Sequence, residues 1–242
     1  MAEISFGKLL IRAIVAGLIA GAAVATYHFF ATEPLIEHAI AIEEGIAPTP
    51  HVEVVSRDVQ RIGLFVGFLI YGATWSALYA VAIQLLGRLI WTTSATRRAL
   101  VIALAGYWAV ALFPFLKFPA NPPGVGEDAT IGYRQLLYVA TLAVSVTGTV
   151  ATIVMGSYAS KRWNGWIASG AAVLLLAAYS GIAFLVIPAS PDPIRLPTLL
   201  VSDFRLRSFV GLTLFWGVMA AVFCVLGMRA TTRRAASIPQ AT

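Results

Sequence analysis

Six long apolar stretches dominate the sequence and leave few folds open to it. They cover residues 9–30, 62–86, 99–116, 136–157, 166–187 and 209–228. A transmembrane helix needs about 20 mostly apolar residues to cross a hydrocarbon core roughly 30 Å thick, and each stretch is close to that length. We therefore predict an all-α, polytopic membrane helix bundle with about six transmembrane helices, which forms one integral membrane domain over residues 1–242.

The composition excludes the main alternatives to a membrane protein. Hydrophobic residues make up 59% of the chain and charged residues only 12%, against about 25% charged in soluble domains. The single cysteine, Cys224, rules out a disulfide-rich scaffold, and the hydrophobicity rules out disorder. The first stretch follows Lys8 as a signal peptide would, but its apolar run is longer than usual for such a signal, which favours a retained span.

Charges fall unequally on the two sides of the expected bundle. Because loops alternate sides, the N-terminus, the loops around 87–98 and 158–165 and a basic tail over 229–242 share one face. Ten basic residues and one acid give that face a formal charge of +9, while seven basic residues and ten acids give the other −3. The positive-inside rule makes the basic face and both termini cytoplasmic. The net charge of +6 thus indicates topology and attraction to anionic lipid, and no nucleic-acid partner.

The first outer loop is rich in side chains that bind metals. Outer loops are expected at about 31–61, 117–135 and 188–208, and residues 32–45 of the first read TEPLIEHAIAIEEG. Pro34 suits a first helical turn and Gly45 a stop. At 100° per residue, Glu33, Glu37 and Glu44 lie within about 40° of one another on such a helix.

Carboxylate and imidazole ligands suit first-row divalent ions. The residues considered for a metal site are Glu33, Glu37, Glu44, His38, His28 and His51. His38 projects about 100° away from Glu37, so one rigid helix does not present both to the same ion. The alternative stays open that this is an ordinary interface helix whose acids are neutralised by Arg57 and Arg61.

Two other regions bear on transport. The second outer loop, from Lys117 to Gly126, has three prolines and two glycines in ten residues, which predicts a rigid turn with outward carbonyls for water, ions or a partner. In the fourth stretch, Ser145, Thr149 and Thr152 share one face. They are candidates for a hydrated path, although such hydroxyls more often bond to carbonyls of their own helix or to neighbouring helices.

Several functions are disfavoured by what the sequence lacks. No Asp, Glu, Lys or Arg lies deep within a stretch, which argues against a carboxylate-driven antiporter. There is no HExxH, GxSxG or Walker motif, so we do not expect an enzyme. Two GxxxG pairs, Gly17 with Gly21 and Gly63 with Gly67, indicate close helix packing, with a homo-oligomer or partner-subunit face as the less frequent use.

Four blocks of sequence carry a resemblance to a known family. They read EPLIEHAIAIEE, RDVQRIGLFVGFLIYG, FPFLKFPANPPGVGEDATIGYRQ and FRLRSF. In these blocks the chain resembles the CbtA family of predicted cobalt transporter subunits, from about residue 10 to 216. The motif positions are Glu33, Glu37, Glu43, Glu44, Arg57, Gln60, Arg61, Lys117, Pro119, Asn121, Pro122, Pro123, Gly126 and Arg134.

The resemblance implies a multi-pass protein of the bacterial inner membrane that is associated with cobalamin-related genes and imports cobalt. It also implies a small one-helix partner, CbtB, with a histidine-rich terminus. Cobalt or another divalent cation would be cargo, with no permanently bound cofactor. We expect a subunit of a divalent metal uptake system that captures cation at its acidic outer face. The alternative is a membrane assembly or interaction factor that docks a partner through its rigid proline-rich outer loops.

Overall fold

A computed structural model describes residues 5–46, 55–92 and 94–236, and every regular element in these ranges is helical. The main helices are α1 (Phe6–Ala31), α2 (Glu33–Ile46), α3 (Arg57–Leu86), α4 (Ala95–Tyr107), α5 (Phe113–Lys117), α6 (Ile131–Ala159), α7 (Gly165–Val186) and α8 (Thr198–Ala236). Short elements are η1 (Gly87–Leu89), the π-helix η2 (Trp108–Leu112) and η3 (Asp128–Thr130).

Six helical segments are long and apolar enough to cross a membrane, which confirms the predicted number. They are Phe6–Ala31, Arg57–Leu89, Ala95–Lys117, Asp128–Ala159, Gly165–Val186 and Thr198–Met228. The longest has 33 residues, or about 50 Å at 1.5 Å per residue, so its polar end extends past a hydrocarbon core of roughly 30 Å.

The last span begins earlier than expected. The sequence predicts an outer loop over 188–208, whereas α8 already starts at Thr198, directly after Pro197. Leu200, Val201 and Phe204 are buried on this added stretch. These three apolar residues recur at helical spacing on the buried face, while Asp203 lies on the exposed face. The charged residues between them are therefore compatible with a continuous helix.

The core lies where α1 packs against α3 and α8. Gly17 and Gly21 bring the backbones of α1 and α3 together, because a Cβ on Gly17 would overlap the carbonyl oxygen of Gly72. Buried Phe215, Met219 and Phe223 of α8 complete the core, and the rings of Phe215 and Phe223 lie against Tyr71 and Tyr79 of α3. The first GxxxG pair therefore serves packing within the chain, whereas nothing in the described structure lies within 4 Å of a Cβ on Gly63 or Gly67.

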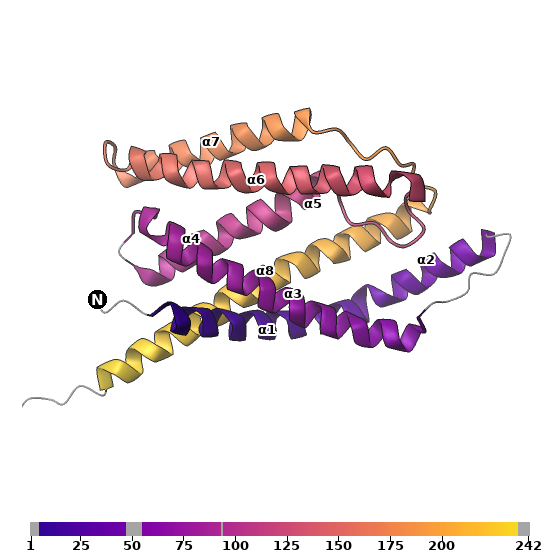
Figure 1. The fold of residues 1–242 in the computed structure, drawn as a ribbon, viewed down its shortest axis with the longest axis horizontal. Helices are drawn as coiled ribbons and strands as arrows, with labels where there is room; N and C mark the ends of the chain where they lie inside the picture. Colours follow the sequence, from indigo (N-terminus) through magenta and orange to yellow (C-terminus); the bar gives the residue numbers. More distant parts are fainter. Residues whose placement is uncertain (1–4, 47–54, 93, 237–242) are drawn as a thin grey trace, which may run out of the picture.

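A second layer is formed by the α6–α7 hairpin. Gly148 lets the ring of Tyr179 lie against α6, and the Tyr179 hydroxyl donates to the carbonyl of Val144 at 3.0 Å. Figure 1 shows this pair along one side of the molecule, with α4 and α5 between it and the layer of α1, α3 and α8. The hairpin meets the rest of the bundle mainly along η2 and α5.

The π-helix in the third span has a local cause. Pro114 follows it in α5 and has no N–H to give to the carbonyl four residues earlier. In a regular α-helix its ring would also clash with that carbonyl. The wider π-turn includes one extra residue and so relieves the clash. The wide turn packs against α6, which carries the hydroxyl stripe.

The two ends of the bundle differ in charge. At one end α1 and α7 finish and α3, α6 and α8 begin; we call it the acidic end. It carries Glu33, Glu37, Glu43, Glu44, Asp58, Glu127, Asp128, Asp192 and Asp203. The opposite, basic end carries Arg88, Arg97, Arg98, Lys161 and Arg162. In Figure 1, α1 begins and α8 finishes at the basic end, so both lie on one side, while their cytoplasmic location stays a prediction.

Candidate functional site at the acidic end

The junction of α1 and α2 is closed by His28 and Thr32. Thr32 ends α1, and its hydroxyl Oγ1 lies 2.7 Å from Nδ1 of His28. The imidazole ring stacks on Phe68 of α3 at 5.0 Å between centroids, and Gly211 of α8 leaves the space that its Nε2 occupies. His28 is thus enclosed by three helices and engaged in packing.

The carboxylates of α2 meet two arginines at the start of α3. Oε1 of Glu33 accepts from Nη2 of Arg57 at 2.5 Å and lies 3.4 Å from Nε of Arg61. Arg61 also pairs with Glu37 and, at 3.6 Å, with Asp58. The Glu33 side chain is only 9% exposed, whereas that of Glu37 is 48% exposed. The structure therefore contains the neutralising arrangement that the sequence left open.

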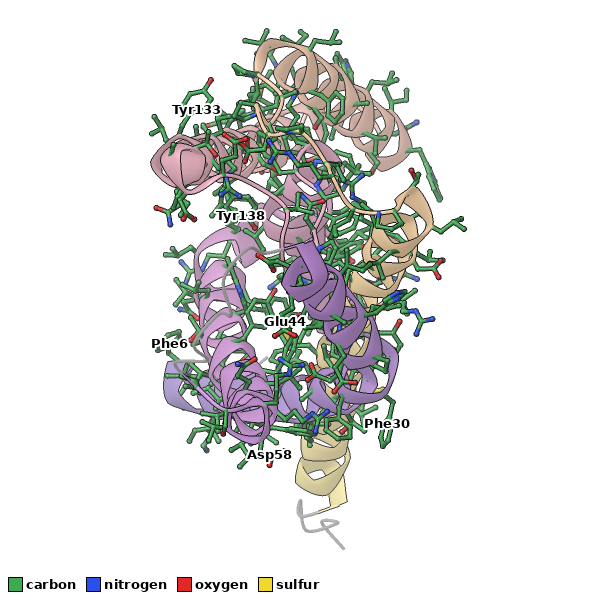
Figure 2. The ribbon with its side chains drawn as sticks, turned by 90° about the vertical axis from the view of Figure 1, so that its right-hand side faces the viewer. Phe6, Phe30, Glu44, Asp58, Tyr133 and Tyr138 are labelled. Carbon is green, nitrogen blue, oxygen red and sulfur yellow. The ribbon has the colours of Figure 1, made fainter. Side chains whose placement is uncertain are left out.

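The α2 stripe becomes more open along the helix. Glu44 is exposed and lies near the middle of Figure 2, which looks onto the acidic end. Within the described residues it has no ion pair, unlike Glu33 and Glu37. Glu43 lies against the second loop, where its Oε2 would be 3.3 Å from a Cβ on Gly124.

The predicted metal ligands are not gathered into one cluster. Over the ranges that the structure describes, no group of three His, Cys, Asp or Glu residues is placed to hold an ion. His38 is exposed on α2, and His28 is packed between helices. His51 lies outside the described residues. Metal binding by Glu33, Glu37, Glu44, His38, His28 and His51 therefore stays a prediction.

The proline-rich loop makes specific contacts around the acidic end. Both Nε and Nη2 of Arg205 donate to Oδ1 of Asn121, at 3.3 and 2.7 Å. Gly124 and Gly126 have φ of 80° and 106°, which only glycine adopts without strain. A Cβ on Gly126 would also overlap the guanidinium of Arg134. These contacts give physical reasons for Asn121, Gly126 and Arg134 of the motif.

The remaining motif residues support the same framework. Lys117 donates from Nζ to the carbonyl of Phe184 at 2.9 Å, which ties the end of α5 to α7. Gln60 accepts from Arg57 at 2.5 Å and donates to the carbonyl of Val55 at 2.8 Å. Pro122 is buried, and Pro119 and Pro123 are partly buried.

A buried aspartate is the main residue that sequence reasoning missed. Asp192 has a side chain only 4% exposed, and its Oδ2 lies 2.9 Å from Nε of Arg134. Its Oδ1 accepts from the Thr130 hydroxyl at 2.7 Å. In the sequence, Asp192 is a single acid between two prolines, and nothing in that pattern indicates a partner nearly 60 residues earlier. Arg134 itself belongs to one of the blocks that carry the family resemblance.

Arginines after Asp192 link the outer segments to the helices. Arg195 pairs with Glu127 at 3.0 Å. Arg207 donates to the carbonyl of Ala31 at 2.5 Å, which is one of the last carbonyls of α1 and has no partner within that helix. Arg205 and Arg207 belong to the block FRLRSF, so the block pointed to them without indicating what they bind.

The hydroxyl stripe of α6 is buried. Ser145 and Thr149 are each 4% exposed and Thr152 is 7% exposed. Thr141, on the same face, donates to its own helix at the Leu137 carbonyl. In contrast, Oγ of Ser145 and Oγ1 of Thr149 have no hydrogen-bond partner in the described structure. Hydrogen bonding to a carbonyl of the same helix, one of the alternatives for these hydroxyls, is therefore found for Thr141 but not for Ser145 or Thr149.

The arrangement offers oxygen ligands of two kinds. The carboxylates of Glu33, Glu37, Glu127 and Asp192 are matched by arginines and hold α2, α3, α6 and the loops together. Those of Glu43, Glu44, Asp128 and Asp203 form no ion pair with another described residue. A cation at this end can therefore approach unpaired carboxylates first and reach the paired ones only in competition with guanidinium groups.

Comparison with known proteins gives one match. A family described as "Probable cobalt transporter subunit (CbtA)" matches residues 6–227. No curated protein and no solved structure matches the chain. The matched range contains the first five spans, the sixth span except its last residue, Met228, and the whole of the acidic end as described.

Proposed function

The chain belongs to the CbtA family of probable cobalt transporter subunits, and from this premise we propose that it captures a divalent cation, cobalt above all, at its acidic end and passes it across the membrane. The family and the six spans make it a multi-pass membrane protein of a transporter. The proposed role is transport without catalysis, in the bacterial inner membrane, with the basic end in the cytoplasm.

The graded stripe on α2 is the observation that carries the proposal. Glu44 is exposed and unpaired among the described residues, Glu37 is half exposed with one arginine, and Glu33 is nearly buried with two. A cation arriving from water is attracted by the free carboxylate with little desolvation, and each later position demands more desolvation and displacement of a guanidinium. We assign capture to Glu44 and Glu37, and positioning of α2 to Glu33.

A path across the bundle needs polar atoms within the membrane. Ser145 and Thr149 supply two hydroxyls without partners, and Thr152 continues the same face. The π-helix packs against α6, and π-bulges inside helices frequently occur at functional sites. We propose that the cation moves along this face, where hydroxyls and helix carbonyls replace part of its hydration.

A transporter subunit acts with partner subunits. Because this sequence has no Walker motif, any drive from nucleotide hydrolysis must come from another chain. We propose a small one-helix, histidine-rich subunit of the CbtB type as one partner. Its imidazoles would supply the nitrogen ligands that the described acidic end does not gather.

Cobalt uptake is the direct test. Purified protein is reconstituted into vesicles, with and without the small subunit, and entry of radioactive cobalt is followed. Uptake above empty vesicles supports the proposal. Equal cobalt accumulation in cells with and without the gene, together with no uptake by vesicles containing both subunits, contradicts it.

A second function, a non-transport factor that docks a partner, is favoured by the rigid, arginine-braced loop from Lys117 to Gly126. The double variant Glu37→Gln/Glu44→Gln separates the two roles. Capture predicts a large loss of cobalt binding measured by calorimetry, whereas docking predicts unchanged binding. Asp58→Asn is the matched control, since its side chain is 91% exposed at the same end but lies off the α2 stripe.

A further inference from the structure

A cavity of about 290 Å³ lies between the two layers of the bundle. Trp75, Leu78 and Leu86 of α3 form one wall, and Val146 and Ile153 of α6 form the opposite wall. Residues of the α4–η2 segment, Thr149 of α6 and Trp216 of α8 also line it. All of these residues belong to the candidate membrane spans, so the cavity lies at membrane depth.

The walls of this cavity suit a hydrocarbon chain. The surface that they present is entirely apolar, so a water molecule placed there would lack the two to four polar partners that it needs. Left empty, the lining would lose dispersion contacts on one side. Leu78 is 51% exposed and Val146 is 36% exposed at its edge, so the cavity is accessible from the side that faces lipid tails.

A cationic group lies beside one end of the cavity. Leu86 is the lining residue nearest in sequence to the basic end, and a Cβ on the next residue, Gly87, would be 3.0 Å from Cδ of Arg98. Arg98 donates from Nη2 to the Thr92 carbonyl at 3.1 Å, whereas its buried Nε has no hydrogen-bond partner in the described structure. Guanidinium groups bind phosphate through several donors at once.

We propose that this cavity binds one acyl chain of an anionic bilayer phospholipid whose phosphate lies near Arg98. The lipid chain fills the space between α3 and α6, which the protein itself leaves open. The lipid chain thereby contacts both the α6–α7 hairpin and the core layer at the level of the cavity, where the side chains of α3 and α6 do not meet. The site is separate from the acidic end, but it shares Thr149 of α6 with the proposed cation path, and the tests below measure lipid binding without any transport readout.

Fluorescence quenching tests whether a lipid chain enters. Trp75, Trp91, Trp108, Trp163 and Trp166 are replaced by Phe, so that Trp216, which is only 5% exposed, is the sole indole. The protein is placed in vesicles of phosphatidylglycerol brominated in mid-chain. Quenching similar to that of a lipid-facing probe, Val139→Trp in a background without other tryptophans, supports the proposal. Absence of quenching overturns the proposal. That result is also the one expected if a second copy of the chain or a partner helix, rather than lipid, covers the cavity.

Filling the cavity provides a matched pair of variants. Val146→Phe occupies the opening, whereas Val139→Phe adds the same ring to α6 at a site 60% exposed and outside the cavity. We expect Val146→Phe to abolish most of the quenching and Val139→Phe to leave it unchanged. Equal quenching in both variants overturns the assignment to this cavity.

A second measurement uses the protein with all its tryptophans. Native mass spectrometry should detect a retained phosphatidylglycerol that is lost in Val146→Phe and kept in Val139→Phe. Arg98→Gln should reduce the preference for phosphatidylglycerol over phosphatidylcholine, while Arg162→Gln, an exposed arginine at the same end, should not. No retained lipid in the parent protein, or no preference between the two headgroups, contradicts the proposal.

Discussion

The two layers of the bundle are built with different tolerances. Between α1 and α3, backbones touch at Gly17 and Gly72, where a Cβ on Gly17 would meet a backbone carbonyl oxygen that cannot move aside. Between the core layer and the α6–α7 hairpin, contact runs through η2 and α5 and leaves an apolar cavity. A tight backbone contact has one arrangement, whereas layers separated by movable side chains can shift. The core layer is therefore suited to be a fixed frame and the hairpin to be the moving part.

The largest effect is expected from breaking the frame. Gly17→Leu places a side chain against the carbonyl of Gly72 and should destabilise the protein by about 3 kcal/mol or more, at the upper end of overpacking costs. Thermal unfolding in detergent measures this. Gly67→Leu is the matched control, because nothing described lies within 4 Å of a Cβ there. An equal effect of both variants would contradict the assignment of α1–α3 as the tight contact.

A smaller effect is expected where the hairpin is fastened to its outer loop. Asp192→Asn removes the charge that faces Arg134 in a site only 4% exposed, which should cost about 2 kcal/mol. Hydrogen exchange should rise in 187–197 and at the start of α6 while α1 and α3 stay protected. Uniform loss of protection would show that hairpin and frame unfold as one unit.

Within the hairpin, Gly148→Ala tests the α6–α7 contact. The added methyl meets the ring of Tyr179, which can rotate away but then loses its hydrogen bond to Val144. We expect a loss of about 1 kcal/mol, below that of Gly17→Leu, read from the unfolding midpoint. Gly181→Ala has open space around it and serves as the reference. A cost equal to that of Gly17→Leu would remove the contrast between layers.

The smallest effect is expected at the exposed ion pair. Glu37→Gln removes a partner of Arg61 where both side chains are more than a third exposed, and such pairs contribute about 0 to 1 kcal/mol. Unfolding should scarcely change, and adding salt should reduce even that difference. Glu33→Gln, in contrast, removes the negative charge that faces Arg57 and Arg61 at a side chain only 9% exposed, and should lower the midpoint clearly.

The sequence was sufficient for features set by local pattern. Six apolar stretches predict six spans, Pro34 marks the start of α2, and Gly17 with Gly21 predicts a close helix contact, because each depends on residues only a few positions apart. The acidic stripe of α2 and its neutralisation by Arg57 and Arg61 were both considered from spacing.

Contacts between residues far apart in the sequence could not be predicted, because no local pattern specifies them. The Arg134–Asp192 pair and the Arg205–Asn121 bond join segments whose proximity is decided by how the hairpin packs. The early start of α8 was also not predicted, because Asp203, Arg205 and Arg207 look like loop residues in the sequence, and the partners of the two arginines come from distant segments. The cavity has no sequence signal, because its lining comes from four separate segments.

The bond from Arg207 to the carbonyl of Ala31 joins residues 176 positions apart. Ribosomes make α1 first and α8 after every other span described here, so the C-terminal end of α1 waits for its cap through most of translation. Until α8 is inserted, α1 is without Phe215, Met219 and Phe223, which belong to the same buried core as Ala13, Ala16 and Ala20. The core is therefore completed only when the last described span is inserted. Nascent chains that end before α8 expose an unfinished core to the quality-control machinery.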